Sequence, residues 1–276
     1  MDTQFLTLPD GTLAFDEQGT GPLVLCVPGL GDLRAEYRFL VPLLVAAGYR
    51  VVTMDVRGHG ETSVKWPDYT VGATGSDMLA LIEHLNVGPA FIIGTSMAAG
   101  AAVYAAAERP ELVAGLVLIS PFVRVMAPAW QSRLLNIVYA FLLSPLWGVA
   151  FWGRYYTGLY PTQRPADFTD YLDTLKKNLK EPGRLHAVLA MLKDDKAASD
   201  ARLSRIQVPV HIVMGSRDSD FKPPEKEMQL LTGRLHASSQ MIEGAGHYPH
   251  AEMPEQTAPS ILTFLSMQRE RTVHGN

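Results

Sequence analysis

The sequence places a serine in a short motif of small residues, Gly-Thr-Ser-Met-Ala at 94–98. An apolar strand-like run, Ala90–Ile93, precedes this motif, and a helical run of small residues follows it. A tight turn between strand and helix lifts the Ser96 hydroxyl from the sheet on a strained backbone, near the free N–H groups of the helix. The alternative is that Ser96 is merely a helix N-cap, but the buried strand that precedes it favours a nucleophile.

Two further polar residues follow strand-like runs near the end of the chain. Asp218 comes after the run Val210–Met214, and His247 comes after the run Ser239–Ile242. Parallel strands end at one edge of a sheet, so we expect both side chains to lie near Ser96. A serine hydroxyl becomes nucleophilic when a histidine takes its proton, and a carboxylate orients that histidine. The sequence therefore predicts a catalytic triad of these three residues.

Neighbouring residues compete for two of these roles. His250 lies three residues after His247, and Asp220 lies two residues after Asp218. We favour His247 because it directly follows a glycine turn, and we expect Asp220 to be a solvated loop charge or a turn cap. His59, between two glycines, is interpreted as a structural hydrogen-bonding residue. A histidine base with its ordinary pKa would become neutral between about pH 6 and 7.

Composition and charge limit the classes of protein. The 276 residues are 47% hydrophobic and 19% charged, which is typical of a globular chain. A net charge of −4 offers no basic surplus for nucleic acid, so we expect no nucleic-acid partner. The single cysteine, Cys26, excludes an intramolecular disulfide and a Cys-rich zinc site, and we expect it to be a small buried hydrophobe. The remaining histidines show no convergent pattern, so we expect no metal.

Two segments bear on location. Residues Met1–Phe15 contain neither a basic leader nor a long apolar core, which favours a cytoplasmic protein. The run Leu134–Gly153 carries no charge and is about as long as a membrane span. Pro145 and Gly148 interrupt it, so we expect a buried or cleft-lining pair of helices and no integral membrane association.

Alternating strand-like and helical patterns predict the frame that positions these residues. The pattern is typical of parallel strands joined by helices, in an α/β fold with helices on both faces of the sheet. The predicted strands are Thr3–Leu8, Thr12–Glu17, Leu23–Val27, Arg50–Met54, Ala90–Ile93, Leu116–Ile119, Val210–Met214 and Ser239–Ile242. The predicted helices of this frame are Glu36–Ala47, Gly72–Leu85, Met97–Glu108, Pro224–Leu231 and Pro254–Met267. Between them, residues 122–205 lack strand signals and form a helical insert, so a core of 1–121 and 206–276 is expected.

These motifs together resemble the α/β-hydrolase fold superfamily, over Thr3 to Met267. The resemblance rests on the serine turn, the chain order Ser-Asp-His, an Asp-x-Arg-Gly-x-Gly turn at 55–60 and the histidine loop at 244–247. Residues 28–31, Pro-Gly-Leu-Gly, match the oxyanion loop of that family except that proline replaces histidine, and Ala98 stands where the serine turn has glycine. The resemblance implies a mostly parallel eight-stranded sheet, a helical cap at 122–205 and oxyanion N–H groups from Leu30 and Met97.

The resemblance also implies an activity. A serine nucleophile implies a serine hydrolase without cofactor or metal that cleaves a small-molecule carboxylic ester with an apolar acyl or alcohol part. The cap is rich in large apolar residues, and those expected to line the substrate pocket are Phe122, Met126, Trp130, Trp147 and Trp152. A lactonase, thioesterase, C–C bond hydrolase, secondary perhydrolase or slow-turnover small-molecule receptor would use the same triad. The motifs leave these alternatives and the oligomeric state open.

Overall fold

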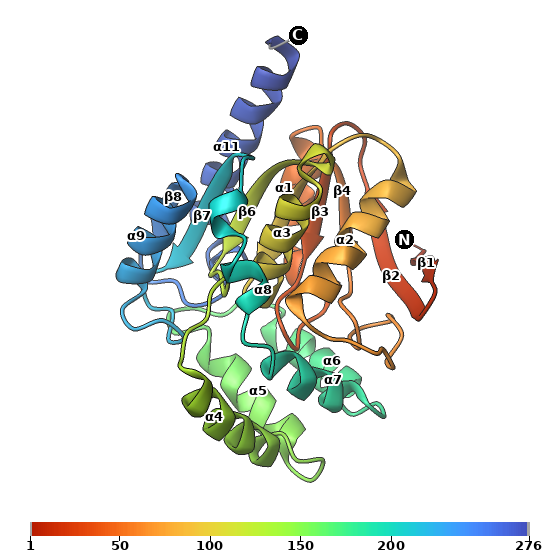
Figure 1. The fold of residues 1–276 in the computed structure, drawn as a ribbon, viewed down its shortest axis with the longest axis vertical. Coiled ribbons are helices and arrows are strands. Elements are labelled where there is room, and N and C mark those ends of the chain that lie inside the picture. Colours follow the sequence, from red (N-terminus) through yellow and green to blue (C-terminus); the bar gives the residue numbers. More distant parts are fainter. Residues whose placement is uncertain (1, 275–276) are drawn as a thin grey trace.

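An eight-stranded sheet is the centre of the computed structural model, which describes residues 2–274 (Figure 1). The spatial order of the strands is β1-β2-β4-β3-β5-β6-β7-β8. Only the pairs β1–β2 and β2–β4 are antiparallel within the described residues, which confirms the predicted mostly parallel sheet. The strands are β1 (Gln4–Leu8), β2 (Gly11–Gln18), β3 (Leu23–Val27), β4 (Arg50–Met54), β5 (Ala90–Thr95), β6 (Val113–Ile119), β7 (Val210–Gly215) and β8 (Ser238–Ile242).

The central strands are buried on both faces because helices cover both sides of the sheet. Side chains alternate along each strand, so Leu25 and Ile92 enter one apolar core whereas Cys26 and Ile93 enter the other. The first core lies under α2 (Val71–Leu85), α3 (Met97–Glu108) and α9 (Pro224–Leu235). The second lies under α1 (Leu40–Ala46) and α11 (Pro254–His274).

Three predicted helices differ from the structure, one of them α9, which continues to Leu235 rather than ending at Leu231. The expected helix Glu36–Ala47 is divided into a 3-10 turn, Arg34–Tyr37, and helix α1. Pro42 explains the division, because a proline ring is tolerated in the first turn of a helix but not in its interior. Helix α11 continues to His274, beyond the expected end at Met267.

Four helices between β6 and β7 lie together beyond the carboxyl ends of the strands (Figure 1). They are α4 (Ala129–Leu142), α5 (Gly148–Gly158), α6 (Phe168–Leu179) and α7 (Arg184–Leu192). The short helix α8 (Ala197–Asp200) follows α7, and the short helix α10 (Pro249–Glu252) follows β8. A third apolar core, which includes Tyr156, Leu175 and Val188, joins this insert to Tyr248 of the histidine loop.

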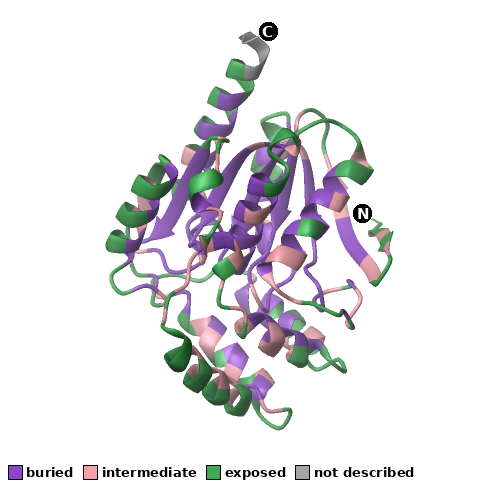
Figure 2. Cartoon of the chain, in the orientation of Figure 1, coloured by how far each residue is buried: buried purple, intermediate pink, exposed green. Residues whose placement is uncertain are grey.

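The uncharged run at 134–153 is divided between α4 and α5, as its proline predicts. Within residues 2–274 no helix has both the length and the apolar character that a membrane span needs. Of the two expected positions, buried or cleft-lining, α4 has the second, because none of its residues is buried (Figure 2) and one of its faces lines a cavity. The other face of α4 is exposed to solvent.

Strand β5 and helix α3 approach each other closely where the serine turn joins them. Helix α3 consists mainly of alanine and glycine, so its backbone lies against the sheet. A Cβ atom on Gly94 would lie 2.7 Å from the Ala98 carbonyl oxygen, a distance that real Cβ atoms do not reach. Position 94 therefore has to be glycine.

We expect Gly94→Ala to lower the free energy of unfolding by about 1–3 kcal/mol, because the added methyl group overpacks the junction. Urea denaturation measures this change. Gly233→Ala is the matched control, because no atom lies within 4 Å of a Cβ atom there and alanine favours the helix. Equal midpoints for the wild type and Gly94→Ala would contradict the packing argument.

Candidate active site

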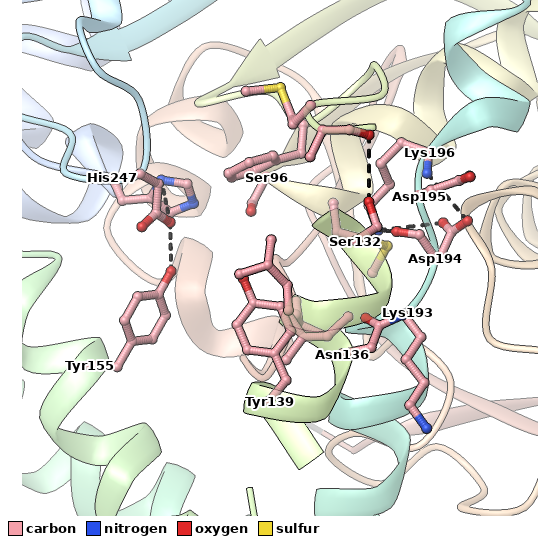
Figure 3. A pocket seen from close by; sticks show the side chains of 18 of the residues that line it. Ser96, Ser132, Asn136, Tyr139, Tyr155, Lys193, Asp194, Asp195, Lys196 and His247 are labelled. Atoms are coloured by element: carbon pink, nitrogen blue, oxygen red, sulfur yellow. Dashed lines mark hydrogen bonds and ion pairs between the residues drawn. The ribbon is translucent and has the colours of Figure 1, made fainter. Parts of the chain in front are cut away.

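Ser96 stands at the turn between β5 and α3 with an unusual backbone. Its φ is 58° and its ψ is −118°, a conformation that strains any residue with a Cβ atom. The neighbouring chain holds it there, because its N–H donates to the Ile119 carbonyl at 2.8 Å and its carbonyl accepts from the Phe122 N–H at 3.1 Å. The Ser96 hydroxyl makes no capping hydrogen bond and lines a cavity (Figure 3), so the N-cap alternative is not realised.

His247 and Asp218 meet beside Ser96, at the carboxyl ends of β8 and β7. His247 Nδ1–H donates to Asp218 Oδ2 at 2.9 Å, and both side chains are buried. In the described residues Ser96 Oγ and His247 make no hydrogen bond, although both line the same cavity (Figure 3). Such contacts are often long in a protein without substrate and shorten when substrate binds.

A second carboxylate approaches the same histidine. Asp220 Oδ2 lies 3.7 Å from His247 Nδ1 and accepts a hydrogen bond of 2.6 Å from the Tyr155 hydroxyl. Only 16% of the Asp220 side chain is exposed, so the expectation of a solvated loop charge is wrong. Tyr155 belongs to α5 of the insert, and nothing in the spacing of the sequence connects it to the triad.

The two carboxylates change the titration of the imidazole. Burial disfavours a charged ring, but Asp218 and then Asp220 outweigh it and raise the pKa of His247 to about 9. Burial would raise the pKa of Asp218, yet the charge and hydrogen bond of His247 lower it. Burial raises the pKa of Asp220, against the opposing charge of His247. The expected transition between about pH 6 and 7 is therefore corrected to about 9.

The loop at 28–31 lies against the serine turn and has two of its N–H groups occupied. The Gly29 N–H donates to Glu36 Oε2 at 2.8 Å, and the Gly31 N–H donates to His59 Nε2 at 3.0 Å. Burial lowers the pKa of His59 to about 4, which keeps this ring neutral and able to accept. Leu30 lies between these two anchored glycines and lines the cavity, which leaves its N–H available for a ligand.

Met97 offers a second backbone donor. It is the first residue of α3, where N–H groups have no partner within the helix, and it lines the cavity beside Ser96. A built Cβ atom on Gly29 would lie 3.3 Å from Ser96 Cβ, so the two donor-bearing turns face each other closely. An oxygen atom held between them would receive two N–H groups.

His250, the competing histidine, has a different position. Its Nε2 lies 2.9 Å from Glu36 Oε1, both side chains are buried, and its ring lies against Tyr37. His250 is not among the residues that line the cavity. His250 contacts the Glu36 carboxylate, which accepts from the Gly29 N–H. It therefore lies under the loop at 28–31 and not beside Ser96.

The cavity beside Ser96 has a volume of about 360 Å³ and three of the five expected pocket residues, Phe122, Met126 and Trp152, line it. Trp147, at the N-terminus of α5, and Trp130, on α4, lie outside and are 41% and 69% exposed; α4 presents the face opposite Trp130 to the cavity. That face carries three polar residues that the sequence analysis did not select, Ser132, Asn136 and Tyr139 (Figure 3). Their polar character at helical spacing in an otherwise apolar segment is the signal that could have identified them.

One group of side chains could also hold a cation. Asp218, Asp220 and His247 offer ligand atoms within 4.8 Å of one another. A cation on His247 Nδ1 would displace the proton that Asp218 accepts, so ligation and the observed hydrogen bond exclude each other.

We expect the ring resonances of His247 to titrate near pH 9 in NMR spectra, because two carboxylates stabilise the imidazolium. Asp220→Asn should lower this pKa, and Asp218→Asn should lower it further because it also removes the hydrogen-bond acceptor. Asp170→Asn, at an exposed site on α6, is the control and should leave it unchanged. A wild-type transition at the ordinary histidine pKa would show that the carboxylates do not act as described.

A family model described as the alpha/beta hydrolase fold matches residues 22–254. Among solved structures, a thermophilic esterase from Thermogutta terrifontis superimposes with a TM-score of 0.81 at 23% identity, over 97% of this chain and 99% of that one. The 3-oxoadipate enol-lactonase 2 of Acinetobacter baylyi is 26% identical over 210 residues, 75% of each chain. A Karrikin insensitive 2 receptor of Petunia hybrida is 26% identical over 257 residues, 88% of this chain and 91% of that protein. The chain belongs to the α/β hydrolase fold family.

Proposed function

We propose that this protein is a serine hydrolase that cleaves carboxylic esters of small molecules. The observation that carries the proposal is the 2.9 Å hydrogen bond from His247 Nδ1 to Asp218 in the cavity that Ser96 enters from a strained turn. A strained turn keeps the hydroxyl exposed, and the buried carboxylate fixes the tautomer whose Nε2 can accept its proton. In this proposal residues 122–205 are a cap over a core of 1–121 and 206–276.

The reaction begins when Ser96 Oγ attacks the ester carbonyl carbon and its proton passes to His247 Nε2. The carbonyl oxygen becomes an oxyanion, which accepts hydrogen bonds from the Leu30 and Met97 N–H groups. The C–O bond then breaks, and the alcohol leaves with the proton from His247. Water, deprotonated by the same histidine, hydrolyses the acyl-enzyme and releases the acid, so the chemistry needs no cofactor.

The two carboxylates have different parts in this reaction. Asp218 accepts the Nδ1 proton and holds the ring orientation, whereas Asp220 adds negative charge at 3.7 Å without that hydrogen bond. Because His247 must be neutral to accept a proton, kcat/KM should rise with pH through its pKa of about 9 in the free protein.

The cavity favours substrates of a particular kind. Phe122, Trp152 and Leu159 provide apolar walls, whereas Ser132 and Asn136 of α4 provide polar groups on the same cavity. A volume of about 360 Å³ suits a small ester. We infer a substrate with an apolar acyl or alcohol part and a polar group that can reach α4.

A small-molecule receptor with slow turnover is the second candidate, favoured by the likeness to the Petunia receptor. A receptor binds its ligand and changes its stability, whereas an esterase releases product many times per molecule. Turnover number on p-nitrophenyl esters of increasing acyl length, measured beside the thermal shift, distinguishes the two.

We expect Ser96→Ala to lower turnover of these esters at least about a thousandfold, because it removes the nucleophile. Ser76→Ala, which removes an exposed hydroxyl on α2 away from the cavity, should retain wild-type activity. Circular dichroism checks that both variants fold. More than about a tenth of wild-type turnover in Ser96→Ala would contradict the proposed nucleophile.

Replacing each carboxylate separates their roles. Asp218→Asn should lower kcat roughly three to four decades, because the amide presents a donor to a ring N–H that needs an acceptor. Asp220→Asn should stay within about tenfold of the wild type at high pH and shift its pH profile to lower pH. The reverse pattern would assign the catalytic carboxylate to Asp220, and near-normal rates in both would contradict the triad.

A further inference from the structure

Helix α4 presents its apolar residues to solvent. Five large apolar side chains, between 42% and 69% exposed, recur at helical spacing and form what we call the outer α4 face: Trp130, Leu134, Ile137, Val138 and Phe141. Figure 2 shows α4 exposed along this side, at the end of the molecule away from the sheet. Leu146 and Trp147, in the loop that follows, extend the same exposed apolar surface.

The opposite face of the helix lines the cavity and is mostly polar, with Ser132, Asn136 and Tyr139 directed inward (Figure 3) and Leu135 as its apolar member. A helix on the surface of a globular protein normally has the reverse arrangement, with its apolar stripe inward. The exposed apolar residues are concentrated here, since eight of the thirteen large exposed hydrophobic side chains among the described residues lie between Met126 and Trp147. A contiguous apolar surface of this kind marks a site that another phase or molecule covers.

The charge around this surface is mostly positive, although Lys176 beside it is paired with the exposed Asp173 at 3.4 Å. Residues 112–166 contain four arginines and no aspartate or glutamate, although the whole chain has a net charge of −4. Arg133 flanks the outer α4 face and is exposed. Beside Leu146 and Trp147, a surface hollow of about 560 Å³ is lined by Arg154, Lys176 and Lys180 and by no acidic residue.

We propose that the outer α4 face, with Leu146, Trp147 and their basic neighbours, binds the surface of an anionic lipid bilayer. Tryptophan, leucine and phenylalanine side chains enter the boundary between headgroups and acyl chains. Arginine and lysine beside them pair with lipid phosphates, and the negative surface potential attracts them. The helix lies in the plane of the interface and does not cross it, which agrees with the absence of a spanning helix in residues 2–274.

A second copy of the chain fits this surface less well. A two-fold dimer through the outer α4 face would bring Arg133 of each copy, and the basic hollow beside Trp147, near the same groups of the other copy. Like charges across an interface oppose association, and the residues that line the hollow include no acidic residue that could offset them.

Binding to a bilayer is a property beyond the proposed ester hydrolysis, and it would place α4 between the bilayer and the cavity that contains Ser96. Helix α4 is the element between the exposed apolar surface and the cavity, since its two faces serve both. Lipid binding requires no turnover, so a binding experiment tests it even if the proposed function is wrong.

The experiment is co-sedimentation of the full chain with vesicles of phosphatidylcholine alone and with vesicles of equal parts phosphatidylcholine and phosphatidylglycerol. We expect at least about tenfold tighter binding to the anionic vesicles, weakened by salt. The double variant Leu134→Asp with Ile137→Asp should lose at least about tenfold in that affinity. Arg133→Glu with Arg154→Glu should remove most of the preference for anionic vesicles.

Leu230→Asp, at a 43% exposed apolar site on α9, is the matched control and should bind like the wild type. Tryptophan fluorescence should shift to shorter wavelength with anionic vesicles, and Trp130→Phe with Trp147→Phe should remove most of that shift. Failure of the wild type to bind either vesicle would overturn the proposal, as would equal losses in Leu230→Asp and the double variant. Light scattering that shows a dimer, made monomeric by the double variant without any vesicle binding, would instead assign the surface to self-association.

Discussion

The close approach of β5 and α3 at Gly94 is the constraint on which the rest of the site depends. Because the Gly94 Cα faces the Ala98 carbonyl so closely, the chain must turn within one residue, and that residue is Ser96 at a φ of 58°. Hydrogen bonds to Ile119 and Phe122 tie this turn to β6 and to the start of the insert. This junction therefore fixes the positions of the Ser96 hydroxyl, the Met97 N–H and Phe122, which lines the cavity.

Charge balance is the second constraint, and it arises from burial. A fully buried imidazole favours its neutral form, but two carboxylates within 3.7 Å reverse that preference. The Tyr155 hydroxyl, from the insert, donates a hydrogen bond to Asp220 and stabilises the charge of that carboxylate. The basicity of His247 thus depends on a contact between the insert and the loop after β7, which couples the electrostatics of the site to the position of α5.

Local pattern was sufficient to predict the sheet and the three central side chains. Apolar runs bounded by turns located all eight strands, and glycine-rich turns after β5, β7 and β8 located Ser96, Asp218 and His247. The contacts that tertiary packing creates were not predictable, because Tyr155 meets Asp220, and His250 meets Glu36, across long stretches of chain. Composition likewise does not specify the rotation of a helix, so Trp130 was placed in the cavity although α4 turns it to solvent.

The rotation of α4 follows from what each of its faces can contact. Inward, it meets a cavity that has charged groups such as Asp220 and Lys196 beside its apolar walls, so Ser132 and Asn136 have polar surroundings there. Outward, no element of the described chain covers Trp130, Ile137 or Phe141. Turning the helix over would move Ser132 and Asn136 to solvent and would place five large apolar side chains in the cavity beside Ser96. The polar-inward orientation is therefore an arrangement that suits an apolar environment outside the protein, and it makes the cavity polar on the side nearest that environment.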